Sequence, residues 1–150
     1  MGLDMYLTKK TYVKNWNHMS DDEKHNVSVE GKSAKEIKPE RITHIEEEVG
    51  YWRKANQIHN WFVQNVQNGN DDCGSHYVSV ELLEQLLAVC KKVEEDNELA
   101  SILLPTQLGF FFGNTDYDEW YLQTIDQTIE ILQKLDLENT TDEFYYQASW

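Results

Sequence analysis

Apolar and polar residues alternate at both ends of the chain, which is the period of a half-buried strand. Near the N-terminus the alternation covers residues 3–8, with Leu3, Met5 and Leu7 on the apolar side. Near the C-terminus it covers residues 144–150. We expect these two segments to pair, so that both ends of the chain lie in one antiparallel sheet.

Over residues 44–67 the apolar residues recur every three or four positions. This period is typical of a helix that faces a core. Thr43 and Glu46 fit a capping box, which predicts a helix that begins near His44 and runs to about Gln67. One stripe of this helix would contain Ile45, Val49, Trp52, Asn56, His59, Phe62 and Val66. Gly50 weakens such a helix by about 1 kcal/mol relative to alanine and indicates a close contact.

Two further long helices are predicted. Ser79 would cap the first, which runs to about Glu95, and the second carries Tyr121, Ile125, Thr128, Leu132 and Leu135 in helical register after an acidic start at residues 115–118,. Residues 14–40 are polar and irregular and resemble an insertion. The fold class is therefore α+β, a single domain over residues 1–150 with about three main helices packed on an antiparallel sheet that contains both terminal strands.

The composition is that of a globular protein, with 40% hydrophobic and 12% aromatic residues,. The chain has no apolar run of about 18 residues and no basic-then-apolar signal sequence at its start, so we expect no membrane association. Cys73 and Cys90 are too few for a disulfide framework. They favour a reducing, cytoplasmic setting.

The formal net charge of −14 arises in one part of the chain. Residues 1–54 hold 10 basic and 10 acidic groups, whereas residues 55–150 hold 3 basic and 17 acidic groups. A surface of this sign repels nucleic acid, so no direct nucleic-acid binding is expected. The acidic excess either serves solubility or forms a face that docks on a basic partner.

Two polar residues, Asn56 and His59, interrupt the predicted apolar stripe. A polar group buried without a partner costs about 1–3 kcal/mol, so each is expected either to pair internally or to face a cavity. Aromatic rings stack on flat ligands, and amide or arginine side chains recognise the edges and charges of such ligands. The predicted ligand-binding residues are Trp52, Arg53, Asn56, His59, Phe111, Asn114 and Tyr117. The alternative is that the aromatic residues fill the core and Arg53 pairs with an acid.

The loop at residues 71–76 holds Asp71, Asp72, Cys73 and His76, which makes a metal site or a cysteine nucleophile conceivable. No metal-ligand spacing is present, and a cysteine nucleophile would need a histidine base and an orienting acid beside it. We therefore assign no metal and no catalytic residue.

A carboxylate cluster, Asp116, Asp118 and Glu119, could serve acid–base hydrolysis,. Acids in the first turn of a helix also interact favourably with the helix dipole, which explains the cluster more simply. The chain has neither the phosphate-binding loop nor the dinucleotide-binding glycine motif, and no cofactor is expected.

Several blocks of the sequence stand out. They are Met-Gly-Leu-Asp-Met-Tyr-Leu at 1–7, Tyr-Trp-Arg-Lys-Ala-Asn at 51–56, Ile-His at 58–59, Trp-Phe at 61–62, Asp-Asp-Cys at 71–73, Leu-Pro-Thr at 104–106, Gly-Phe-Phe-Phe-Gly at 109–113 and Tyr-Tyr-Gln-Ala-Ser-Trp at 145–150. With these blocks the chain resembles a family of small proteins encoded by bacteriophages and prophages. The resemblance covers nearly the whole chain apart from residues 14–40 and brings no known activity. It implies an accessory phage protein in the cytoplasm of a bacterial host, where such proteins often counter host defence.

We therefore expect a phage accessory protein that binds and sequesters a small nucleotide-like ligand without turnover. Two alternatives stay open. One is an acidic inhibitor that docks on the basic, nucleic-acid-binding surface of a host defence protein, and the other is a small hydrolase that uses Asp116, Asp118 or Cys73. The aromatic content also permits a homo-oligomer.

Overall fold

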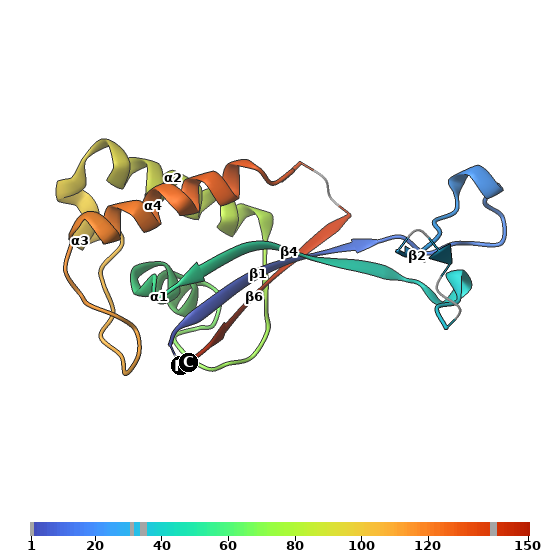
Figure 1. The fold of residues 1–150 in the computed structure, drawn as a ribbon. Coiled ribbons are helices and arrows are strands. Elements are labelled where there is room, and N and C mark those ends of the chain that lie inside the picture. The colour runs from blue at the N-terminus through green and yellow to red at the C-terminus, as the bar shows by residue number, and fades with distance from the viewer. Residues whose placement is uncertain (1, 31, 34–35, 139–140) are drawn as a thin grey trace.

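Both ends of the chain lie in one four-stranded antiparallel sheet (Figure 1). The structure is a computed structural model and describes residues 2–30, 32–33, 36–138 and 141–150. The strands are β1 (Asp4–Tyr12), β4 (His44–Arg53), β5 (His76–Val78) and β6 (Asp142–Ser149), in the spatial order β4-β1-β6-β5. β1 and β6 pair along nearly their whole length. The expected pairing of the two terminal segments and the α+β class are thus confirmed.

Helices pack on one face of this sheet. They are α1 (Asn56–Asn65), α2 (Val80–Glu95), the short α3 (Ala100–Leu103) and α4 (Glu119–Gln133). α2 and α4 lie side by side, α4 also contacts β4, and α1 packs on the sheet, where Phe62 stacks on Tyr146 (Figure 1). Ser79 caps α2, as predicted, because its hydroxyl accepts the N–H of Leu82 at 3.3 Å. Asp118 caps α4 by accepting the N–H of Tyr121 at 3.0 Å.

Residues 44–53 form a strand, not the first half of the predicted helix. β4 pairs with β1 in a register that sets Lys9 opposite Glu47, and their side chains form an ion pair at 3.1 Å. Such cross-strand pairs stabilise a sheet, and pairing with β1 outweighs the local capping signal at Thr43, because tertiary contacts override propensity. The prediction of one helix over residues 44–67 is wrong for its first ten residues, and α1 accounts only for the later part.

Alternation along the strands separates a face covered by the helices from an opposite face. The covered face contributes the buried residues Leu3, Met5, Leu7, Trp52, Phe144, Tyr146 and Ala148. The opposite face carries one tyrosine from each strand, namely Tyr6, Tyr51, Tyr77 and Tyr145. Across this face the ring centroids of Tyr6 and Tyr51 lie 5.4 Å apart, and those of Tyr77 and Tyr145 lie 5.9 Å apart.

An arm made of residues 13–43 extends from the far ends of β1 and β4, away from the helices (Figure 1). It contains the 3-10 turns η1 (Asp21–Glu23) and η2 (Pro39–Arg41) and the two-residue strands β2 (Ser28–Val29) and β3 (Lys32–Ser33). The predicted insertion-like region 14–40 falls in this arm, and residues 31, 34 and 35 of that region lie outside the described residues.

Gly50 lies where β4 passes against the end of α4. A Cβ atom built on it would lie 2.8 Å from Cγ2 of Ile131 and 3.3 Å from Cβ of Leu7. The expected close contact at this glycine is confirmed, although it occurs in a strand.

We predict that Gly50→Ala lowers the free energy of unfolding by about 1–3 kcal/mol, because the added methyl group overpacks the contact with Ile131. Urea denaturation followed by tryptophan fluorescence measures the change. Glu48→Ala, at an exposed position of the same strand, is the control and should change stability by less than about 0.5 kcal/mol. Equal stability of Gly50→Ala and the unmodified protein would contradict the packing at this site.

Candidate functional site

α1 is buried on most of its surface, and this burial includes polar side chains. The buried residues are Asn56, Gln57, Ile58, His59, Trp61, Phe62 and Val63. Each buried polar side chain needs a partner inside the protein. The three polar residues of this set find theirs in three different segments of the chain.

Asn56 anchors the loop that joins α3 to α4. Its Nδ2 donates to the carbonyl oxygens of Phe112, at 3.0 Å, and of Asn114, at 2.9 Å. Its Oδ1 accepts the N–H of Gln107 at 2.9 Å. Both amide hydrogens and the amide oxygen are therefore used by the main chain of the loop, and no ligand is required to explain this buried amide.

His59 links β6 to the loop that follows α1. Its Nδ1 lies 2.6 Å from the hydroxyl of Tyr146, and its Nε2 lies 2.9 Å from Oδ1 of Asp71. Burial lowers the pKa of His59 below its ordinary value, and the Asp71 carboxylate offsets part of that shift. A neutral imidazole satisfies both contacts when Tyr146 donates to Nδ1 and the Nε2–H donates to Asp71. The indole N–H of Trp150 also donates to Asp71, at 3.2 Å.

The other predicted ligand-binding residues lie apart from one another. Trp52 is buried on the helix side of the sheet and donates to Oγ1 of Thr128 at 2.9 Å. Arg53, the next residue of β4, points to the opposite face of the sheet and pairs with Asp4 at 3.2 Å. The seven predicted residues therefore do not form one wall, although the side chain of Asn56 donates a hydrogen bond to the main-chain carbonyl of Asn114.

Phe111, Asn114 and Tyr117 all belong to the loop between α3 and α4. Phe111 has a positive φ of 99°, which is rare for a bulky residue. The Tyr117 hydroxyl accepts the N–H of Thr106 at 3.2 Å. Residues 109–113 form a turn, in which the N–H of Phe112 donates to the carbonyl of Gly109 at 3.2 Å.

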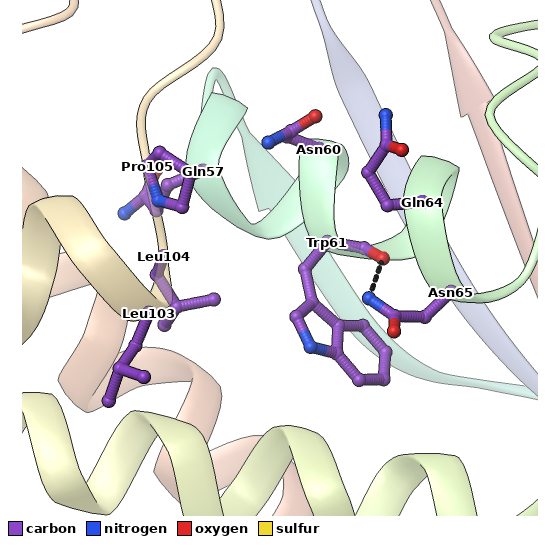
Figure 2. A pocket seen from close by; sticks show the side chains of 8 residues that line it. All are labelled: Gln57, Asn60, Trp61, Gln64, Asn65, Leu103, Leu104 and Pro105. Carbon is purple, nitrogen blue, oxygen red and sulfur yellow. Dashed lines mark hydrogen bonds between the residues drawn. The ribbon is translucent and has the colours of Figure 1, made fainter.

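A hollow of about 140 Å³ opens on another side of α1, against the stem of this loop (Figure 2). Its lining residues are Gln57, Asn60, Trp61, Gln64, Asn65, Leu103, Leu104 and Pro105. None of the seven predicted ligand-binding residues is among them. The sequence signal for this hollow is a set of carboxamides three or four residues apart on α1, which places them along one side of a helix.

The helical part of the chain carries the acidic excess. We use the name acidic layer for residues 79–138, which comprise α2, α3, α4 and their connections and hold 13 Asp and Glu against 3 Lys. All 13 of these acidic residues are exposed, and none forms an ion pair with a residue that the structure describes. This layer therefore presents a negative potential that its three lysines offset only in part.

Large apolar side chains are exposed on the same acidic layer. They are Ile102, Leu108, Phe110, Phe111, Tyr117 and Trp120. Phe110 is 85% exposed and Trp120 is 52% exposed. The hydroxyl of Tyr121 donates to the carbonyl of Leu104 at 2.7 Å, which holds the start of α4 against the end of α3. Trp120 and Ile102 therefore lie at the same end of the helical layer.

The two acidic residues of the loop at residues 71–76 have different hydrogen-bond partners. Asp71 contacts His59 and Trp150, whereas Asp72 accepts from Nε2 of His76 at 2.7 Å and from the N–H of Gly74 at 2.8 Å. Cys73 is exposed, whereas Cys90 is buried on α2. Within the described residues, no group of three or more His, Cys, Asp or Glu side chains could hold a metal ion.

No protein-family model, curated protein or solved structure matches this chain. The assignment of a site therefore rests on the geometry of the chain itself. Among the described residues, no helix combines the length and the apolar character needed to cross a membrane.

We predict that Asn56→Asp destabilises the protein by about 2–3 kcal/mol, because a carboxylate cannot donate to the carbonyls of Phe112 and Asn114 and leaves both unpaired. Urea denaturation measures the loss, and limited proteolysis within residues 107–114 reports release of the loop. Asn60→Asp on the same helix is the control, since the Asn60 side chain makes no hydrogen bond to the described residues. It should change stability by less than about 0.5 kcal/mol. Similar losses in both variants would argue against the anchoring role.

We predict that stability falls as the pH is lowered through and below about 6.5, the ordinary pKa of histidine. In that range the unfolded chain takes up a proton on His59 that the folded chain resists, because burial lowers the pKa of the folded imidazole,. The measurement is the free energy of unfolding at several pH values between about 7.5 and 5.5. His59→Gln should show a shallower decline than the unmodified protein. His25→Gln, which removes an exposed imidazole, should retain the full decline, and a decline unchanged in His59→Gln would refute the assignment.

Proposed function

We propose that this chain is a non-enzymatic binding protein whose acidic layer docks on a basic surface of a partner protein. One observation carries the proposal, namely that carboxylates without an ion pair among the described residues and large exposed apolar side chains occur together on residues 79–138. Solubility accounts for the carboxylates. It does not account for exposed residues such as Phe110 and Trp120, which are costly on a surface that meets only water.

The two kinds of side chain have different tasks in a protein–protein contact. Carboxylates steer a basic partner toward the surface and raise the rate of association. Aromatic side chains such as Trp120 and Tyr117 supply most of the binding free energy once water is expelled. Asp116 and Glu119 lie next to these rings in the sequence and are exposed, which favours a contact with an apolar centre and a charged rim.

The partner that we propose is a bacterial defence protein with a nucleic-acid-binding surface. Such surfaces present Lys and Arg groups that neutralise phosphates. An array of carboxylates presents the same negative charge to these groups as the phosphates do. The resemblance to small phage-encoded proteins supports this class of partner and a site of action in the bacterial cytoplasm. On this proposal the chain occupies the surface that nucleic acid would otherwise use.

A nucleotide-like ligand has less support in the geometry. In the sequence this hypothesis rests on the polar residues Asn56 and His59. In the structure both have hydrogen-bond partners within the protein. The hollow beside α1, at about 140 Å³, is smaller than the roughly 300–1,000 Å³ of ordinary ligand pockets. For a hydrolase, Asp118 has a structural task as the cap of α4.

We predict that the affinity for a partner captured from bacterial lysate falls about tenfold or more between roughly 50 and 500 mM salt, because screening weakens electrostatic docking. Biolayer interferometry with the purified partner measures the dissociation constant. A short DNA duplex should compete with the chain for that partner. Binding that salt and DNA leave unchanged would contradict the proposal.

Two matched double variants locate the docking surface. Asp116→Asn with Glu119→Gln removes two charges beside Trp120, and we predict binding about three- to tenfold weaker with a smaller salt dependence. Glu46→Gln with Glu48→Gln removes two exposed charges from β4 and should leave the affinity within about twofold, since that strand lies outside the acidic layer. Equal weakening by the two pairs would show that only net charge matters.

A further inference from the structure

The hollow beside α1 has an uncharged lining in a strongly acidic protein. Carboxamides from α1 line one side, and Leu103, Leu104 and Pro105 line the other. The indole of Trp61 lies between them and faces the two leucines, with its ring nitrogen turned to that side (Figure 2). Neutral polar groups beside apolar ones suit an occupant that is itself uncharged, partly apolar and able to form hydrogen bonds.

Two side chains of this hollow are nearly buried as residues, and each carries a polar atom that makes no hydrogen bond to the described residues. Trp61 is 8% exposed, and its indole N–H donates to no described acceptor. Gln57 is 3% exposed and donates through Nε2 to Thr124 and to the carbonyl of Tyr121, while its Oε1 accepts from no described donor. Neither atom is fully enclosed by the protein, so both are accessible to water or to a molecule that fills the hollow. One unused donor and one unused acceptor therefore lie in the lining of the same hollow.

The size of the hollow limits what can enter. An apolar cavity of about 150 Å³ holds a benzene molecule, and this hollow is of similar volume, about 140 Å³. A single flat ring or one branched side chain fits, whereas a whole nucleotide does not. The occupant is therefore a group of this size, either free or attached to a larger molecule that lies outside.

We propose that this hollow binds a small uncharged group that pairs an apolar or planar body with an amide function. The amide oxygen accepts the indole N–H of Trp61, and the amide N–H donates to Oε1 of Gln57. The Asn60 carboxamide, which makes no hydrogen bond to the described residues, is available for the same occupant. A nucleobase and an apolar side chain of a peptide with its own backbone amide share this chemistry.

The lining of this hollow favours an uncharged amide over a carboxylate of the same shape. A carboxylate of the same shape lacks the amide donor, and it would enter a protein of net charge −14 without a cationic side chain in the lining. An unsubstituted ring would leave the donor of Trp61 and the acceptor of Gln57 unpaired, which costs binding free energy. The amide therefore binds better than either analogue. This inference does not depend on docking through the acidic layer, so either can fail alone.

Benzamide is the probe, and its titration into isotope-labelled protein tests the site by NMR. The chain has five tryptophans, so the indole N–H signals of Trp16 and Trp120, which are exposed, serve as internal controls. We expect the Trp61 indole signal and the side-chain amide signals of Gln57 and Asn60 to shift, with a dissociation constant on the order of 1 mM. Benzoate and benzene should bind about tenfold more weakly. No shift at about 10 mM benzamide, or equal binding of all three compounds, overturns the proposal.

Trp61→Phe keeps an aromatic ring and removes the indole N–H. We expect benzamide to bind about five- to tenfold more weakly to this variant, as the loss of one hydrogen bond implies, while benzene binding changes little. Trp120→Phe, outside the hollow, is the matched control and should bind benzamide as the unmodified protein does. If Trp61→Phe does not fold, the comparison of the three compounds on the unmodified protein still decides the question.

Two further probes distinguish the sources of the amide group. Uracil represents a nucleobase, and N-acetylphenylalaninamide represents a peptide. Binding of uracil tighter than benzamide assigns the hollow to a nucleobase, and tighter binding of the peptide analogue assigns it to an apolar side chain of a protein. Both results support the site. Failure of both probes to displace benzamide from it counts against the proposal.

Discussion

A helix that is buried on nearly every side has to satisfy its polar side chains inside the protein, and α1 organises the fold through this requirement. Asn56 bonds to the loop between α3 and α4, Gln57 bonds to α4, and His59 connects β6 to the loop after α1. Leaving one such group unpaired costs about 1–3 kcal/mol, so the three contacts reinforce one arrangement. The bonds of Asn56 fix the base of the loop that carries Phe110, whose side chain stays exposed.

The sequence predicted those elements whose signals are local. Alternation at residues 3–8 and 144–150 identified the two strands that pair, and the side chain of Ser79 marked the start of α2. Residues 44–53 show the limit of this approach, because their capping signal at Thr43 is also local and is overridden. The deciding interaction, the pairing of β4 with β1, joins residues far apart in the chain. Without a known partner strand, the helical spacing of Trp52 and Asn56 was indistinguishable from the end of a strand followed by a helix.

The candidate site was harder to predict than the fold. The sequence left two outcomes open for Asn56 and His59, internal pairing or contact with a cavity, and the structure has the first for both. Trp52 and Arg53 were expected on one helical wall, yet adjacent residues of a strand point to opposite faces. The hollow depends on Trp61 and Leu104 coming together across a loop, which no sequence spacing encodes. Only the carboxamides along α1 gave a signal, and it lies outside the apolar stripe.

The negative charge and the exposed apolar side chains of the acidic layer constrain each other. Side chains such as Phe110 and Trp120 would favour self-association on a neutral surface, but two copies that each carry a net charge of −14 repel one another,. A homo-oligomer through this layer would therefore require salt, which at about 0.1 M screens charges beyond roughly 10 Å. A basic partner reverses the sign of the same electrostatic contribution, so that attraction brings the apolar groups into contact. On the proposed docking, the carboxylates would therefore discriminate between partners before any aromatic ring is buried, and the rings would then determine how long a selected partner stays.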